Sequence, residues 1–190
     1  MFRDSTWIVP MILVTSAYLV CFYVTFLIIF PFQNAVFGTI PVYASLLYLP
    51  HGVRVLVARF YGWKAVVFLA PATLQTHYYL SGWKGGAEIN LISVGASLLC
   101  APLSFWIYEK LKNAVGNGGK PNFDWRSLLI VGVMASLINA LALNLYHFDL
   151  APMEMLRASL AYSIGDISGQ FLIMFLLMMS FRWARKFERA

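Results

Sequence analysis

Apolar runs long enough to form membrane-spanning helices alternate with short polar connections along this chain. The clearest run, residues 7–30, contains no charged residue and exceeds the ~20 residues that a bilayer-crossing helix needs. The pattern predicts five further spans, at residues 32–49, 65–80, 89–108, 128–148 and 156–181. Because the second of these contains Gly38 and Pro41, it is predicted to be a kinked span or a re-entrant segment.

A short helix is predicted at residues 53–61, between the second and third spans. It contains Arg54 and Arg59, and it lies between His51 and Lys64. We interpret it as an interfacial helix whose cations contact anionic lipid. The alternative is an anion site, because a helix N-terminus and an arginine both attract negative charge.

Composition agrees with this pattern, because 61% of the residues are hydrophobic and only 12% are charged. Soluble domains carry about 25% charged residues. The predicted fold class is all-α: residues 1–190 form one transmembrane domain, a polytopic integral membrane bundle of about six helices, some kinked by proline or glycine. Cys21 and Cys100 lie in apolar runs and are interpreted as buried hydrophobic residues.

The distribution of positive charge supports six spans independently of hydropathy. With the N-terminus inside, the inner segments hold twelve of the fourteen Lys and Arg residues: Arg3, Arg54, Arg59, Lys64, Lys110, Lys112, Lys120, Arg126, Arg182, Arg185, Lys186 and Arg189. Only Lys84 and Arg157 fall outside, which satisfies the positive-inside rule. The chain is therefore predicted to be a multi-pass membrane protein with both termini in the cytoplasm.

The last predicted span carries a polar stripe beside a row of small residues. The stripe, on one helical face, consists of Ser159, Tyr162, Ser163, Asp166 and Gln170. The small residues, which would let another helix approach closely, are Ala161, Gly165 and Gly169. A carboxylate at membrane depth is costly, so Asp166 should face protein or a wet cavity. It is either bonded to a neighbouring Asn, Tyr or Arg in a packing contact, or part of a ligand- or ion-responsive centre.

Two sets of candidate site residues follow. The ligand-binding or signal-coupling candidates are Asp166, Gln170, Tyr162, Arg157, Asn139 and Asn144. The candidates for an outer polar mouth are His77, His147, Asp149 and Glu154, together with Glu88. Histidines and carboxylates suit a metal or pH-responsive site, but without a local ligand pair we interpret the mouth residues as interfacial and predict no metal site.

Enzymatic signatures are absent from the sequence. It contains no HExxH, no GxSxG, no phosphate-binding glycine loop and no CxxC motif. We therefore expect a protein that is not an enzyme and has no cofactor.

Two short motifs carry a family resemblance. Pro50-x-Gly52 is followed by Gly62-Trp63, and Gly165-Asp166-x-x-Gly169 opens the final span after an arginine. Residues 45–181 thereby resemble the bacterial membrane-associated sensor domain found at the N-terminus of histidine kinases and diguanylate cyclases. The resemblance implies a helical inner-membrane sensor in which the proline, the glycines and Asp166 have structural or signal-related roles.

The chain departs from that family's pattern in three ways. It has fewer spans than expected, Ser163-Ile164 replaces a tryptophan-containing stretch, and no output domain follows Ala190. We therefore expect a sensor-like or ligand-binding module that signals or docks through a membrane-protein partner or a second copy. The expected contacts are the lipid bilayer and a small ligand, and no nucleic acid. The alternatives are a subunit similar to the S-component of energy-coupling-factor vitamin transporters, and a structural accessory subunit of a larger membrane complex.

The predicted topology can be tested with compartment-sensitive reporters fused after Lys84 and after Lys120. The alternation of spans places Lys84 outside and the loop at residues 116–120 inside. We expect opposite reporter activities at the two positions, and equal activities would contradict the topology.

Overall fold

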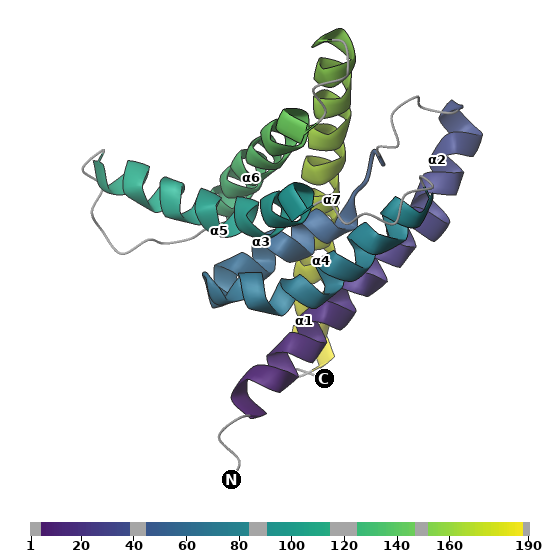
Figure 1. Cartoon of the computed structure of the whole chain (residues 1–190). Helices are drawn as coiled ribbons and strands as arrows, with labels where there is room; N and C mark the ends of the chain where they lie inside the picture. Colours follow the sequence, from purple (N-terminus) through teal and green to yellow (C-terminus); the bar gives the residue numbers. More distant parts are fainter. Residues whose placement is uncertain (1–4, 39–44, 84–90, 115–124, 147–151, 188–190) are drawn as a thin grey trace.

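The computed structural model describes residues 5–38, 45–83, 91–114, 125–146 and 152–187, and in these residues it is built of helices without strands (Figure 1). The elements are α1 (Ser5–Val24), η1 (Thr25–Ile29), α2 (Phe30–Phe37), α3 (Leu49–Tyr61), α4 (Lys64–Trp83), α5 (Leu91–Ala114), α6 (Trp125–Tyr146) and α7 (Pro152–Phe187). The predicted all-α fold class is thus confirmed.

The first three elements form one continuous helical run. The element η1 is a π-helix in which the N–H of Phe30 donates to the carbonyl of Thr25. Pro31 follows at once, and a proline ring has no N–H and collides with the carbonyl four residues earlier. The wider π turn accommodates that ring, so the helix continues to Phe37 and stops at Gly38, whose φ is 76°. The predicted span at residues 32–49 is therefore interrupted after Phe37, and residues 39–44 lie outside the described residues, so a kinked or re-entrant segment there stays a prediction.

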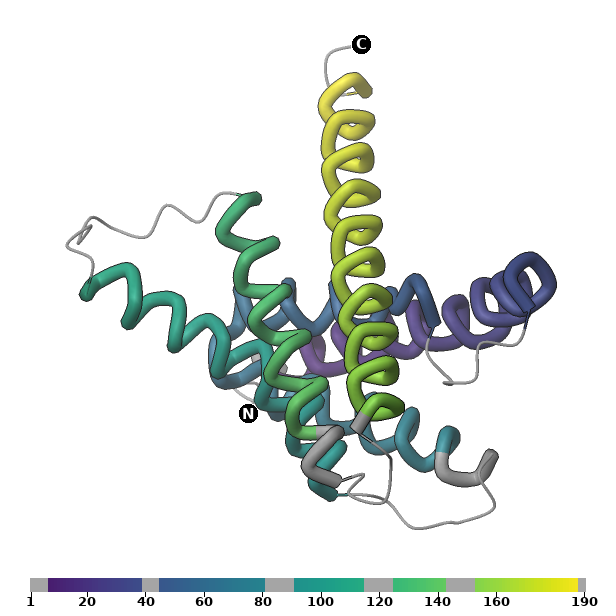
Figure 2. Tube along the Cα trace, turned by 90° about the horizontal axis from the view of Figure 1, so that it is seen from above, coloured from purple at the N-terminus to yellow at the C-terminus, as the bar shows by residue number. Residues whose placement is uncertain are grey.

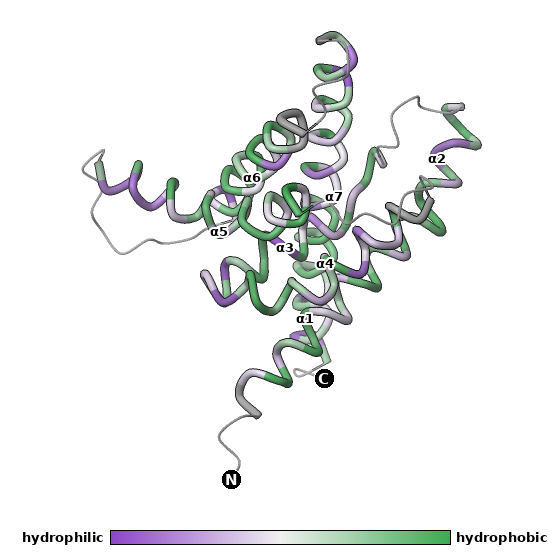
Figure 3. Tube along the Cα trace, viewed as in Figure 1, coloured by the Kyte–Doolittle hydropathy of each residue, from purple (hydrophilic) through white to green (hydrophobic). Residues whose placement is uncertain are grey.

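Four helical stretches are long and apolar enough to cross a membrane: Trp7–Phe37, Leu91–Ala114, Trp125–Ala142 and Met153–Phe187. The helix predicted at residues 65–80 is present within α4, which is not among these four. Hydrophobic residues make up much of α1, whereas hydrophilic residues gather at the C-terminal end of α5 (Figure 3). These features describe a helical membrane protein, and six complete spans stay a prediction.

The short helix α3 lies at the centre of the bundle. It packs against α1, α4, α5, α6 and α7. Its first turn is held by other elements, because the Leu49 N–H donates to Thr25 Oγ1 (3.3 Å) and the Tyr48 N–H just before it donates to the Gly165 carbonyl (2.8 Å). Arg54 is only 2% exposed. The interpretation of this helix as an interfacial element is therefore wrong for Arg54, whereas Arg59, in its last turn, is exposed.

The helix α7 touches the non-helical segment at residues 45–48 through its small residues. A Cβ on Gly165 would collide with the Ser45 carbonyl, and one on Gly169 would collide with the Tyr48 carbonyl. Ser168, on the same helix, donates a short hydrogen bond to the carbonyl of Leu46. The predicted close approach is present at both glycines, but its partner is mainly the non-helical segment at residues 45–48 that leads into α3.

This contact predicts opposite effects for two glycine-to-alanine substitutions. Gly169→Ala places a methyl group against backbone and should lower the free energy of unfolding by about 1–3 kcal/mol or more. In the control Gly95→Ala, nothing lies within 4 Å of the new Cβ, so the helix should gain up to about 1 kcal/mol. Thermal unfolding in detergent, followed by circular dichroism, measures both. Equal melting temperatures in the two variants would contradict the packing.

Candidate functional site

A group of buried polar side chains joins α1, α3, α5 and α7, and we refer to it as the buried polar cluster. Its members are Tyr18, Tyr48, His51, Arg54, Cys100 and Asp166, all of them buried except Tyr48, which is half-buried. A buried charge is tolerated only when other polar groups compensate it, so these contacts determine whether the bundle is stable.

Arg54 supplies the positive charge of the cluster. Its Nη2 donates to the Tyr18 hydroxyl (2.9 Å), and its Nη1 donates to Cys100 Sγ (3.8 Å). The guanidinium carbon also lies 5.8 Å from the centroid of the Tyr18 ring, and that hydroxyl lies 3.5 Å from the Tyr48 hydroxyl. Its Nε is buried without a hydrogen-bond partner among the described residues. The direct partners of this cation are thus neutral groups, so its charge needs an anion elsewhere in the cluster.

The carboxylate that acts electrostatically on Arg54 belongs to Asp166. It is 4% exposed and faces His51, the third residue of α3, with its Oδ2 3.3 Å from His51 Nδ1. Its carboxylate therefore faces the first turn of α3, where the helix dipole favours negative charge. Both atoms lie within ion-pair distance, yet neither takes part in a hydrogen bond within the described part of the chain.

The tautomer of His51 explains this contact. His51 Nε2 lies 3.1 Å from the Gly132 carbonyl, which can only accept, so Nε2 is assigned the proton. In a neutral ring Nδ1 then has a lone pair, which faces the lone pairs of the Asp166 carboxylate. One proton added to His51 Nδ1 would turn this repulsion into a hydrogen bond. The pair is therefore a site that gains an interaction when it binds a proton.

Gln170 attaches α7 to α6 beside this pair. Its Nε2 donates to the Leu128 carbonyl (2.7 Å), and its side-chain amide occupies the space where a Cβ on Gly132 would be. The same Gly132 accepts the contact from His51, so α3, α6 and α7 meet at one glycine. The His51–Asp166 contact and the side chain of Gln170 are therefore neighbours around Gly132.

The other signal-coupling candidates lie at different depths. Tyr162 is half-buried one helical turn before Asp166. Arg157 is exposed, and its position nine residues before Asp166 places it about 13 Å away along the helix. Asn139 is buried on α6, and its Oδ1 has no hydrogen-bond partner among the described residues. The structure thus joins Asp166 to Gln170 and separates it from Arg157.

Little of the predicted outer mouth can be placed. His77 lies on α4 with its Nε2 3.4 Å from the Ser97 hydroxyl, and Glu154 is exposed in the first turn of α7. Glu88, His147 and Asp149 lie outside the described residues, as does the side chain of Asn144. Within the described ranges, no three His, Cys, Asp or Glu side chains come together as metal ligands do.

Sequence reasoning missed the two most important partners, His51 and Arg54. Both were assigned to the inner surface because they stand next to Pro50-x-Gly52 and a basic stretch. One signal in the sequence was Gly52, because a glycine within a helix often marks the close approach of another backbone. The structure shows that approach, since an added Cβ on Gly52 would lie 3.0 Å from the Gln170 Cα.

No family model, curated protein or solved structure matched this chain.

The opposite charges of Arg54 and Asp166 predict a coupled effect on stability. Arg54→Gln leaves the carboxylate buried without its counter-charge and should cost about 3–5 kcal/mol. Asp166→Asn in turn leaves the buried guanidinium without its counter-charge, whereas the double variant removes both charges. We expect the double variant to be at least about 1 kcal/mol more stable than the sum of the single effects requires.

Chemical or thermal unfolding in detergent provides this double-mutant cycle. Arg157→Gln is the matched control, because that arginine is exposed on α7 and its loss should change stability by no more than about 0.5 kcal/mol. Additive effects of Arg54→Gln and Asp166→Asn would show that the two charges do not compensate each other.

Proposed function

We propose that this protein is a non-enzymatic membrane sensor module whose input is protonation of the His51–Asp166 pair. The single observation that carries the proposal is the 3.3 Å contact between two buried atoms, His51 Nδ1 and Asp166 Oδ2, neither of which has a hydrogen-bond partner among the described residues. A purely structural contact would be expected to pair a donor with an acceptor. Histidine is also the side chain whose ordinary titration range covers pH 5–8.

The mechanism is a change in how α7 packs. Without the extra proton, facing lone pairs push Asp166 away from α3, and the bond from Gln170 to Leu128 holds α7 on α6. With the proton, a hydrogen bond draws the two helices together. The glycines at positions 165 and 169 pack directly against the backbone of residues 45–48. A displacement of α7 at Asp166 is therefore transmitted along the helix axis.

The C-terminal half of α7 is suited to pass this shift on. From Gln170 to Phe187 the helix extends about 25 Å, and Figure 2 shows it projecting beyond the rest of the bundle. Its apolar side chains are exposed, among them Phe171, Phe175 and Phe181. We propose that a partner membrane protein or a second copy receives the signal here, and that the basic end with Arg182 and Arg185 lies in the cytoplasm of a bacterial cell.

A vitamin-binding transport subunit and a structural accessory subunit would both use the same projecting surface for docking. Neither function gives a reason for a histidine acceptor to face a buried carboxylate. The proton-responsive sensor accounts for both features, and the other two remain alternatives to it.

The test compares hydrogen–deuterium exchange of α7 at matched pH values from about 5 to 8, in nanodiscs, after correction for the intrinsic pH dependence of exchange. The wild type should show a pH-dependent change in protection around residues 165–173. His51→Gln keeps the charge balance of the cluster and should abolish that change.

His77→Gln is the matched control, because it removes another partly buried histidine and leaves the pair intact. It should preserve the wild-type pH response. A wild type without any such response, or a response that survives His51→Gln, would refute the sensor mechanism.

A further inference from the structure

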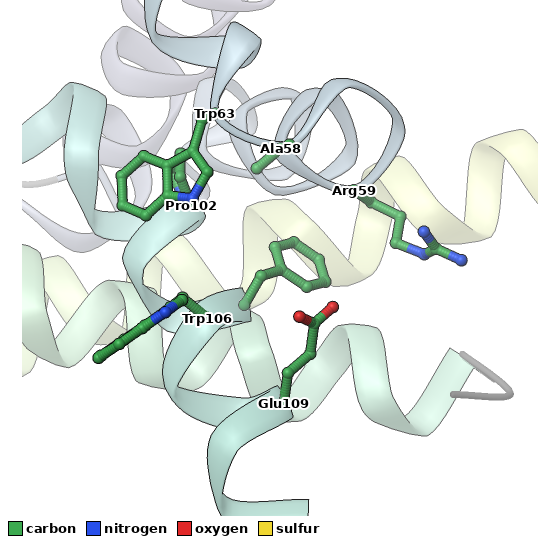
Figure 4. A pocket seen from close by; sticks show the side chains of 8 residues that line it. Ala58, Arg59, Trp63, Pro102, Trp106 and Glu109 are labelled. Atoms are coloured by element: carbon green, nitrogen blue, oxygen red, sulfur yellow. The ribbon is translucent and has the colours of Figure 1, made fainter. Parts of the chain in front are cut away.

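A hollow of about 150 Å³ lies between the end of α3, the turn that follows it and the C-terminal half of α5 (Figure 4). The residues that line it include Arg59, Trp63, Pro102, Phe105, Trp106 and Glu109. No member of the buried polar cluster lines the hollow, and the charged residues of the hollow are exposed.

The turn that opens the hollow depends on Gly62. Its φ of 56° is a conformation that glycine adopts readily, and the turn places Trp63 on the rim. Phe105 is 8% exposed, whereas Trp63 and Trp106 are 54% and 49% exposed. In Figure 4 the two indoles and Pro102 lie on one side of the hollow, and Arg59 and Glu109 lie on the other.

The two rim charges select the kind of ligand. A guanidinium binds phosphate with two parallel hydrogen bonds, and a carboxylate accepts hydrogen bonds from an ammonium group. Indole faces also attract cations. A simple anion would be repelled by Glu109, and a simple cation by Arg59. A ligand that carries a phosphate and an ammonium group a few atoms apart satisfies both.

The surroundings indicate where such a ligand would come from. Lys64 Nζ lies 4.6 Å from the Trp7 ring centroid, and Lys110 Nζ lies 5.9 Å from that of Trp106. Tryptophan and lysine together at the ends of apolar helices are typical of the membrane–water boundary. The volume equals about five waters at ~30 Å³ each, which suits a headgroup whose tails remain outside.

We propose that this hollow binds the headgroup of a zwitterionic phospholipid with a primary ammonium group. The phosphate lies against Arg59, and the ammonium lies against Glu109 and the indole of Trp106. This site does not depend on the proposed proton response, since none of its residues belongs to the His51–Asp166 pair.

Native mass spectrometry of the full chain in detergent, titrated with phosphatidylethanolamine or phosphatidylglycerol, tests the proposal. The wild type should prefer phosphatidylethanolamine. Glu109→Gln and Trp106→Leu should each weaken binding of that lipid roughly three- to tenfold and leave phosphatidylglycerol binding unchanged or stronger. Arg59→Gln should weaken binding of both lipids.

Glu154→Gln is the control, because it removes an exposed carboxylate on α7 outside the hollow. Circular dichroism melts identify any variant that has lost its fold, and the indole variant gives a second reading if the carboxylate variant is unstable. An unchanged lipid preference in both Glu109→Gln and Trp106→Leu would overturn the site. Displacement of the lipid by equimolar glycerophosphoethanolamine would overturn the lipid as the source of the headgroup.

Discussion

The burial of Arg54 is the constraint on which the rest of this bundle depends. A guanidinium that is 2% exposed inside an apolar bundle must be compensated, or its desolvation would cost several kcal/mol. Tyr18 and Cys100 supply acceptors, and among the described residues Asp166 supplies the negative charge that acts on Arg54, electrostatically and not through a direct contact. Because these groups come from α1, α5 and α7, compensation of one charge fixes the position of three helices around α3.

The need to compensate the charge of Arg54 also explains where the central helix α3 begins and why it is short. The helix α3 has 13 residues, which is about 20 Å and shorter than a bilayer core. Its first turn begins inside the protein, where Thr25 caps Leu49 and the segment at residues 45–48 lies in the glycine groove of α7. Non-helical backbone at membrane depth is tolerated only where protein surrounds it. The groove therefore allows α3 to start where Arg54 and His51 reach their partners.

These two features mark what sequence could and could not predict. The apolar runs located α4 to α7 because length and hydropathy are local properties, and helical periodicity placed Asp166 and Gln170 on one buried face. The predicted end of the first span at residue 30 is wrong, because a π turn accommodates Pro31 and the helix continues to Phe37. Arg54 failed for a different reason. A basic residue in a short helix resembles a surface residue until its partners are known, and Tyr18 is 36 residues away in sequence.

Both proposed sites share α3, with His51 in its first turn and Arg59 in its last. A helix of this length moves as a rigid element, so a displacement at the proton-binding end also displaces the rim of the hollow. Linkage then makes the effect reciprocal: any factor by which protonation changes headgroup affinity must equal the factor by which the headgroup changes proton affinity. If both sites operate, a lipid at the boundary would set the pH at which the buried pair responds, and α7 would report the combined state.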